Sequence, residues 1–280
     1  MDRAPVNHIA MSLHQYLSLR ILRKVPQISI IFWVIKLLTT AMGESFSDYL
    51  VFHINPYVAV VVGGVGLLVA LVLQLRARRY VPWIYWFAVS MVAVFGTMAA
   101  DVLHVVLGIP YFVSSTFFAV ALAAIFIAWY LNERTLSIHS IDTPRRELFY
   151  WATVMATFAL GTALGDLTAA TFGLGYLASG VLFGVLFAIP AVAYRWFGLN
   201  EIVAFWFAYI VTRPLGASFA DWSGKSSLGG LGIGDAKVSL VLTLLIVAFV
   251  AYLTVTRRDA HPSDTPELDL VEDDLGTVRG

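Results

Sequence analysis

The chain has 280 residues, of which 59% are hydrophobic and 13% are charged, and its formal net charge is zero. Globular domains are about 45–50% apolar and about 25% charged, so this composition excludes an ordinary soluble fold. The absence of cysteine excludes disulfides and thiolate metal sites, and nothing in the charge balance indicates a nucleic-acid partner.

Residues 1–26 form a basic segment with apolar residues at helical spacing. Leu13, Tyr16, Leu17 and Ile21 recur on one side of a helix, which predicts an amphipathic helix on the cytoplasmic surface of a membrane. The segment lacks a compact apolar core followed by a small-residue cleavage site. We therefore do not expect it to be removed as a secretory signal.

Apolar runs long enough to cross about 30 Å of hydrocarbon as α-helices follow one another along the chain. They predict an all-α integral membrane domain over residues 27–256. An even number of crossings places both ends of the chain on one side of the membrane. The eight predicted spans are 27–49, 56–75, 81–103, 111–131, 147–168, 174–194, 201–222 and 234–256.

The basic residues predict the orientation of these spans. Those in the short connections fall on one side, which the positive-inside rule assigns to the cytoplasm. The opposite connections contain only Lys225 among basic residues, so both termini are predicted to be cytoplasmic. Residues 257–280 are acidic and free of aromatic residues, and we predict a disordered tail there.

A motif of fixed spacing recurs in the odd-numbered spans. Each contains an aromatic residue followed by tryptophan, then glycine ten residues after the tryptophan and aspartate five residues after the glycine. Identical spacing four times indicates an internal repeat. The four copies are Trp33, Gly43 and Asp48; Trp86, Gly96 and Asp101; Trp151, Gly161 and Asp166; and Trp206, Gly216 and Asp221.

The repeat unit contains two spans, and we interpret it as a helix hairpin. The units cover about 27–75, 81–131, 147–194 and 201–256. Because each begins on the same side, they are parallel repeats about an axis along the membrane normal. This symmetry predicts a ring or a two-by-two bundle.

These residues resemble a bacterial family of uncharacterised membrane-anchored proteins that contain four copies of a short repeat of unknown function. The resemblance covers residues 27–256 and is carried by the stretches around Lys36 to Asp48, Gly161 to Asp166, and Thr212 to Asp221. It implies an eight-helix integral protein of a bacterial inner membrane, and it implies no particular chemistry.

The four aspartates share one level near the predicted outer face. One interpretation is that each ends a span and accepts hydrogen bonds from the outer loop or from the next helix. The other is that the four carboxylates converge as an acidic mouth that concentrates cations. The sequence leaves both interpretations open.

The first repeat carries the most polar span. Lys36, Thr40, Gly43 and Ser47 lie within about 60° on a helical wheel, with Glu44 beside them. A charge near the bilayer centre costs at least about 2.5–3.5 kcal/mol, so these groups require partners. Arg213 lies at a matching depth, which predicts a Glu44–Arg213 ion pair that either forms a transport site or only locks the first repeat to the fourth.

Two histidines follow the first two aspartates near the outer face. His53 and His104 could join Asp48 and Asp101 in a weak divalent-metal site, although interfacial histidines are more often simply solvated.

The sequence favours a small transporter or channel for a proton or a hard divalent metal. Its site residues would be Lys36, Thr40, Glu44 and Arg213 at the centre, with Asp48, Asp101, Asp166 and Asp221 as the mouth. The alternative is a membrane sensor, chaperone or scaffold that binds another membrane protein and whose ion pairs are structural. We expect no enzymatic activity and no cofactor, since no catalytic motif is present.

Overall fold

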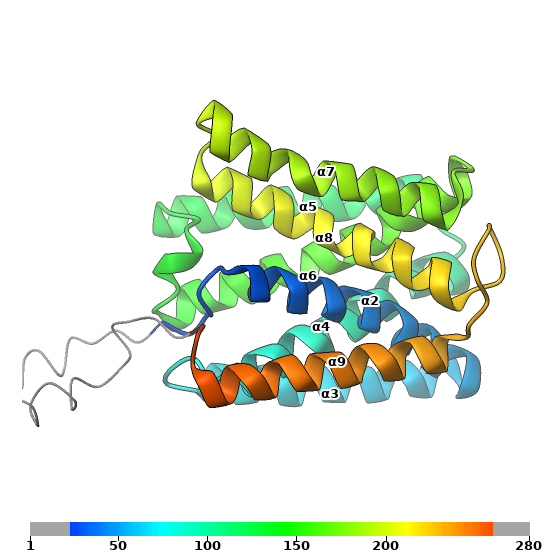
Figure 1. Cartoon of the computed structure of the whole chain (residues 1–280), viewed down its shortest axis with the longest axis horizontal. Helices are drawn as coiled ribbons and strands as arrows, with labels where there is room; N and C mark the ends of the chain where they lie inside the picture. Colours follow the sequence, from blue (N-terminus) through cyan, green and yellow to red (C-terminus); the bar gives the residue numbers. More distant parts are fainter. Residues whose placement is uncertain (1–22, 260–280) are drawn as a thin grey trace, which may run out of the picture.

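The computed structural model describes residues 23–259, which contain eight long helices and no strand (Figure 1). All eight are long and apolar enough to cross a membrane, which indicates a multi-pass membrane protein. The helices are α2 (Ile30–His53), α3 (Pro56–Arg76), α4 (Pro82–Asp101), α5 (Tyr111–Glu133), α6 (Pro144–Asp166), α7 (Gly175–Phe197), α8 (Glu201–Gly224) and α9 (Asp235–Thr256).

The helix bounds agree with the predicted spans to within four residues. Two helices continue past their repeated aspartates in a wider, π-helical turn. These turns are Val102–Val106 after α4 and Leu167–Thr171 after α6. The predicted amphipathic segment and acidic tail lie mostly outside the described residues.

Local sequence signals set the helix starts. The side chains of Ser29, Asn55 and Asn200 each accept a hydrogen bond from a backbone N–H in the first turn of α2, α3 and α8. Proline occupies the first position of α3, α4 and α6, where its missing N–H has no helical partner to lose. The predicted spans therefore start close to the observed helices.

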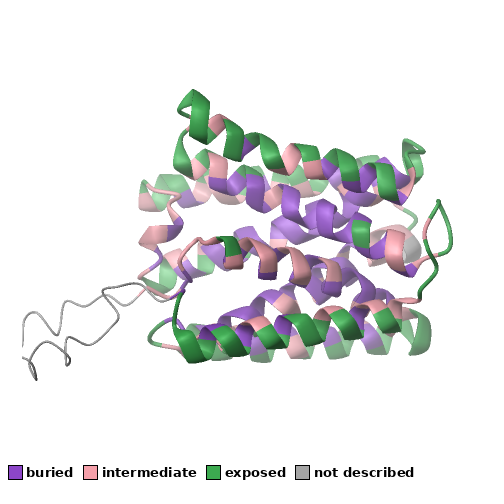
Figure 2. Cartoon of the chain, viewed as in Figure 1, coloured by how far each residue is buried: buried purple, intermediate pink, exposed green. Residues whose placement is uncertain are grey.

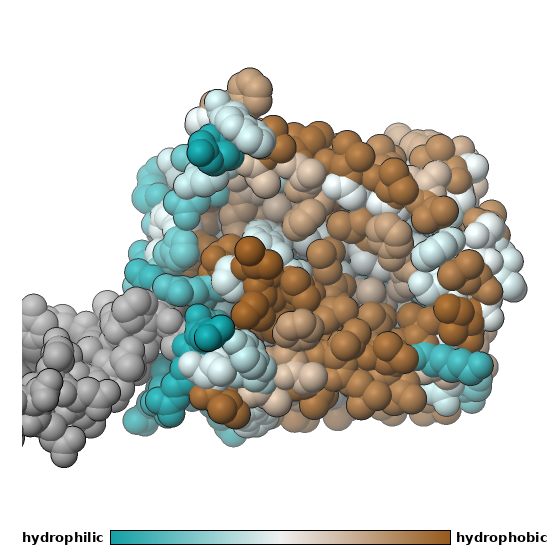
Figure 3. Space-filling model, viewed as in Figure 1, coloured by the Kyte–Doolittle hydropathy of each residue, from teal (hydrophilic) through white to brown (hydrophobic). Residues whose placement is uncertain are grey.

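The helices form an inner and an outer layer, and Figure 2 shows buried residues in the middle of the bundle and exposed residues along its top and bottom. Helices α2, α4, α6 and α8 form a closed inner ring, in which each contacts its two neighbours. In these four, 56–72% of the most apolar stretch is buried, against 17–28% in α3, α5, α7 and α9. The ring predicted from the repeats is thus present, and the outer helices present apolar surface along their length (Figure 3).

The two helices of one repeat do not pack mainly on each other, so the hairpin interpretation of the repeat was wrong. Each outer helix instead lies chiefly on the inner helix of the following repeat: α3 on α4, α5 on α6, and α7 on α8. The last outer helix, α9, lies on α2, the first inner helix. The four repeats therefore close into a ring by a cyclic exchange of partners.

The repeated glycines allow this ring to close tightly. A Cβ on Gly43 would meet the Ala93 backbone carbon at 2.8 Å, and one on Gly96 would meet the Phe158 Cβ at 2.9 Å. Gly161 lies against Arg213, and Gly216 lies against Thr40. Each glycine therefore contacts the residue that stands seven positions after the tryptophan of the next repeat. Close helix approach at small residues is the usual packing mode in lipid.

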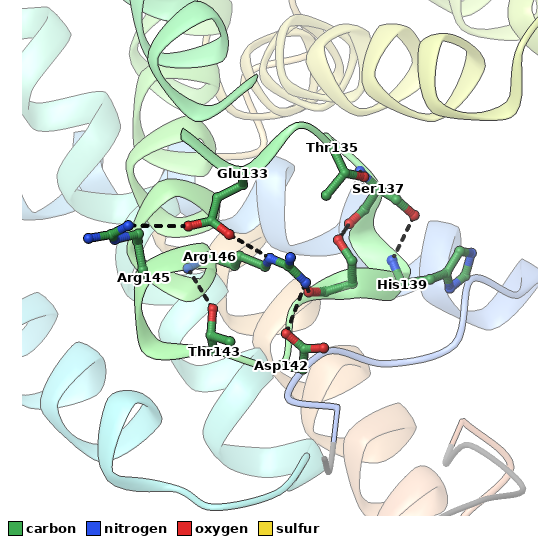
Figure 4. Close-up of polar contacts among 9 residues, drawn as sticks. Glu133, Thr135, Ser137, His139, Asp142, Thr143, Arg145 and Arg146 are labelled. Atoms are coloured by element: carbon green, nitrogen blue, oxygen red, sulfur yellow. Dashed lines mark hydrogen bonds and ion pairs between the residues drawn. The ribbon is translucent and has the colours of Figure 1, made fainter. Parts of the chain in front are cut away.

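We call the two ends of the bundle the Trp end, where Trp33, Trp86, Trp151 and Trp206 lie, and the Asp end, where the four repeated aspartates lie. Both ends of the described chain meet at the Trp end, because the Gln27 N–H donates to the Asp259 carbonyl at 3.0 Å. The α5–α6 connection is there too, and Arg146 fixes it by bonding Glu133 at 2.8 Å and Asp142 at 3.1 Å (Figure 4). Hydrophilic side chains gather on this end (Figure 3).

Candidate functional site

Aromatic rings fill the space between the inner helices at the Trp end. The residues that precede the four tryptophans are Phe32, Tyr85, Tyr150 and Phe205, and all four are buried. Each ring contacts the tryptophan of the next repeat at centroid distances of 5.6–6.2 Å. The Tyr85 and Tyr150 hydroxyl oxygens are 2.5 Å apart. We call these four residues the aromatic layer, and it closes the axis of the bundle at the Trp end.

Lys36 lies one turn further along α2 and is only 1% exposed. Its Nζ is 3.9 Å from the centre of the Phe158 ring and 4.1 Å from that of Tyr209. No hydrogen-bond acceptor contacts this nitrogen in the described residues. Cation–π attraction is the stabilisation that the surroundings provide.

Arg213 occupies the centre of the ring, and its side chain is fully buried. Its Nη2 donates to Glu44 Oε2 at 2.6 Å, to Thr162 Oγ1 at 2.7 Å and to Thr97 Oγ1. Its Nη1 donates to the Thr40 carbonyl oxygen at 3.0 Å. The Glu44–Arg213 ion pair predicted from the sequence is therefore present, and we call this group the arginine clamp.

Repeat symmetry explains the arginine clamp. Glu44, Thr97 and Thr162 occupy the same repeat position, eleven residues after the tryptophan, and three inner helices thus direct one side chain each toward the guanidinium. The fourth copy has Ala217 at this position, and Arg213 comes from that copy one turn earlier. The sequence prediction missed Thr97 and Thr162 as partners, although their shared repeat position was a usable signal.

A lysine bridges two of the four aspartates at the Asp end. Asp48 and Asp221 are buried, and the Lys225 Nζ is 2.8 Å from a carboxylate oxygen of each. The pKa of Lys225 is raised well above its usual value, since the charges of Asp221 and Asp48 outweigh burial, which acts to lower it. Asp101 and Asp166 are half-buried, and in the described part of the chain neither forms an ion pair.

Asp48 and Asp221 are followed by three or more further α-helical residues, whereas Asp101 and Asp166 end α4 and α6 and are followed by the π-helical turns. At Asp48 and Asp221 a partner from the loop is present, as the interpretation of span-ending caps predicted, because Lys225 lies in the connection between α8 and α9, although neither aspartate ends its helix. The sequence prediction also missed Lys225, because it lies outside the spans.

The histidines are placed away from this cluster. The His104 ring bonds the Ile109 carbonyl through Nδ1 and the Ser114 hydroxyl through Nε2, at 2.6 and 3.0 Å. The His53 Nδ1 bonds the Tyr49 carbonyl at 2.9 Å. Within residues 23–259, the one group of side chains arranged to hold a metal consists of Glu44, Asp48 and Asp221, whose oxygens lie within 4.8 Å of one another.

The fold and the site together define a class of protein: an eight-helix bundle of four cyclically exchanged repeats, with a charged axis closed at one end. The chain belongs to the family described as Repeat of Unknown Function (DUF347), whose model matches residues 31–80, 84–135, 149–199 and 204–259. No curated protein and no solved structure matches the chain.

Proposed function

We propose that the protein is a small secondary transporter for a cation, either a proton or a hard divalent metal, with its site on the bundle axis. The observation that carries the proposal is an excess of acid along that axis. Five carboxylates, those of Glu44, Asp48, Asp101, Asp166 and Asp221, accompany three basic groups, those of Lys36, Arg213 and Lys225. The two carboxylates in excess, Asp101 and Asp166, are half-buried, and a proton or a cation stabilises a carboxylate that is partly withdrawn from water.

The gradation along the axis supports entry from the Asp end. Asp101 and Asp166 are partly exposed there and have no ion-pair partner between residues 23 and 259, which suits the capture of a cation. Further inward, Glu44 joins this region to the arginine clamp. Lys36 and the aromatic layer then close the axis. This arrangement does not fit a channel that is permanently open. It fits a transporter in a conformation that is closed at the Trp end.

The proposal includes a setting in the membrane. The hydrophilic Trp end, with its arginines, would face the cytoplasm of a bacterial inner membrane, and the Asp end would face outward. Both termini would then be cytoplasmic. The apolar outer surface would contact the lipid bilayer.

One observation favours the alternative, a membrane sensor, chaperone or scaffold. The arginine clamp connects all four inner helices and is fully buried, as expected of a lock between repeats. In that case a further membrane protein would be the partner. The excess of carboxylates has no use in this alternative, so we prefer transport.

Flux in liposomes tests the proposal. The purified protein is reconstituted with pH-sensitive and divalent-sensitive dyes inside, and a proton or Mn²⁺ gradient is imposed. Wild type should carry cation flux, and Glu44→Gln should lose about tenfold or more of it. Because the amide leaves the buried Arg213 charge without a counterion, flux is compared at a temperature at which both proteins remain folded. Glu201→Gln is the matched control, since Glu201 is exposed at the Trp end. Absence of flux for protons and for every divalent ion tested would contradict transport.

A further inference from the structure

The connection between α8 and α9 carries a lysine, Lys225, whose ammonium lies between the carboxylates of Asp48 and Asp221. Lys225 is the first residue of this connection, and its side chain is 24% exposed. Backbone bonds fix its main chain, from the Lys225 N–H to the Asp221 carbonyl at 2.9 Å and from the Gly232 N–H to the Lys225 carbonyl at 3.0 Å. The long side chain can therefore leave the cluster by rotation, while the loop stays in place.

The oxygens that face this ammonium are held by charge and not by aligned hydrogen bonds. Asp48 Oδ2 and Asp221 Oδ1 are buried, and each is itself 2.8 Å from the Lys225 Nζ, but within residues 23–259 neither accepts a hydrogen bond of good geometry. Asp48 is 8% exposed and Asp221 is 4% exposed. A spherical metal ion has no directional donors to align, so it satisfies such oxygens better than an ammonium group does.

The third carboxylate completes a ligand set of the type that hard divalent cations prefer. Glu44 offers an oxygen within 4.8 Å of those of Asp48 and Asp221. Oxygens bound to one ion at about 2.1–2.6 Å are separated by no more than about 5 Å, so the cluster needs little rearrangement. Carboxylates select Mg²⁺, Ca²⁺ or Mn²⁺ over softer metals.

We propose that Glu44, Asp48 and Asp221 form a divalent-cation site, and that the Lys225 ammonium occupies it as a tethered competitor that the ion displaces. This inference deepens the proposed function, because it names the ligand and the residue that limits its access. While Lys225 bridges Asp48 and Asp221, its ammonium takes the position that the ion would occupy. Ion binding breaks two ion pairs and releases the side chain toward the Asp-end surface.

Mn²⁺ binding to the full chain in detergent tests the inference without any transport measurement. Free Mn²⁺ is quantified by electron paramagnetic resonance. Lys225→Gln should bind Mn²⁺ about tenfold or more tighter than wild type, because the ion then no longer has to displace the ammonium from its two ion pairs, and about 1.4 kcal/mol corresponds to a tenfold change in affinity. Lys225→Arg keeps the positive charge and should bind as wild type does. Lys237→Gln is the matched control, because Lys237 is an exposed lysine at the same end.

Two results would overturn the inference: Lys225→Gln binds Mn²⁺ no tighter than wild type, or the tighter binding survives the addition of Asp48→Asn. A measurement on wild type covers the case in which the Lys225 variants fold poorly. Mn²⁺ should accelerate acylation of the Lys225 amine and leave that of Lys237 unchanged, and equal rates with and without Mn²⁺ would also overturn the inference. Tight Mn²⁺ binding without flux in liposomes would refute the proposed transport but not the Mn²⁺ site.

Discussion

Arg213 is the residue on which the centre of the bundle depends. It is a guanidinium without solvent exposure, and its acceptors come from α2, α4 and α6. Removing one partner of a buried ion pair leaves the other charge uncompensated, whereas replacing both with apolar side chains is often nearly neutral. The arginine clamp therefore allows a test by single and double substitutions.

We predict that Arg213→Met lowers the free energy of unfolding by about 3–5 kcal/mol, because Glu44 then stays buried without a partner. Adding Glu44→Met should recover much of this loss. Thermal unfolding in detergent measures both effects. A double variant that is less stable than Arg213→Met would show that Glu44 contributes to stability by some means other than this pair.

Sequence reasoning could find the Glu44–Arg213 pair because two charges at one depth of a membrane domain need each other. It could not find the two threonines by composition, since a threonine in a spanning helix usually bonds its own backbone. Thr97 does so with the Ala93 carbonyl at 2.9 Å, and Thr162 does so with Phe158 at 3.2 Å. Lys225 was missed because a loop lysine is ordinarily solvated.

At the scale of the helices, the repeated glycine is the contact between one inner helix and the next. The residue opposite it changes from copy to copy, through Ala93, Phe158, Arg213 and Thr40, while the glycine does not. Only a residue without a side chain accommodates all four partners at this distance. The glycine in the motif thus reports packing and not chemistry.

We predict that Gly43→Val destabilises the bundle by more than about 2 kcal/mol, because its side chain would meet the backbone of Ala93, which cannot yield. Gly184→Ala is the control, since a Cβ there would meet Leu215 at an ordinary 3.8 Å. It should change stability by less than about 1 kcal/mol. Equal thermal shifts in the two variants would refute the close contact between α2 and α4.

The packing of the outer helices could not be predicted from the sequence. They are apolar on nearly every side, so hydrophobic periodicity gives no sign of which face contacts a partner. Chain proximity then suggested a hairpin, which was wrong. The inner helices were predictable because the motif placed glycine, threonine and charged residues on one face.

At the scale of the molecule, a fourfold framework carries one asymmetric site. The aromatic layer, the glycines and the aspartates recur in each copy, whereas Lys36, Glu44 and Arg213 each occur once. Duplicated helices supply the closed ring, and single substitutions within it supply the charges. Transport in this account requires that the axis be wet at the Asp end and dry at the Trp end.

The absence of native cysteine makes that claim directly measurable by the reactivity of single introduced thiols in membranes. We predict that Asp166→Cys reacts with a charged thiol reagent from the same side as Ser226→Cys, an exposed loop position. It should react faster with a cationic reagent than with an anionic one, because the remaining carboxylates attract cations. Tyr85→Cys, in the aromatic layer, should react from neither side. If the Asp166→Cys variant is folded but does not react, while the Ser226→Cys variant does, the axis is dry. That result would contradict transport and favour a structural membrane module.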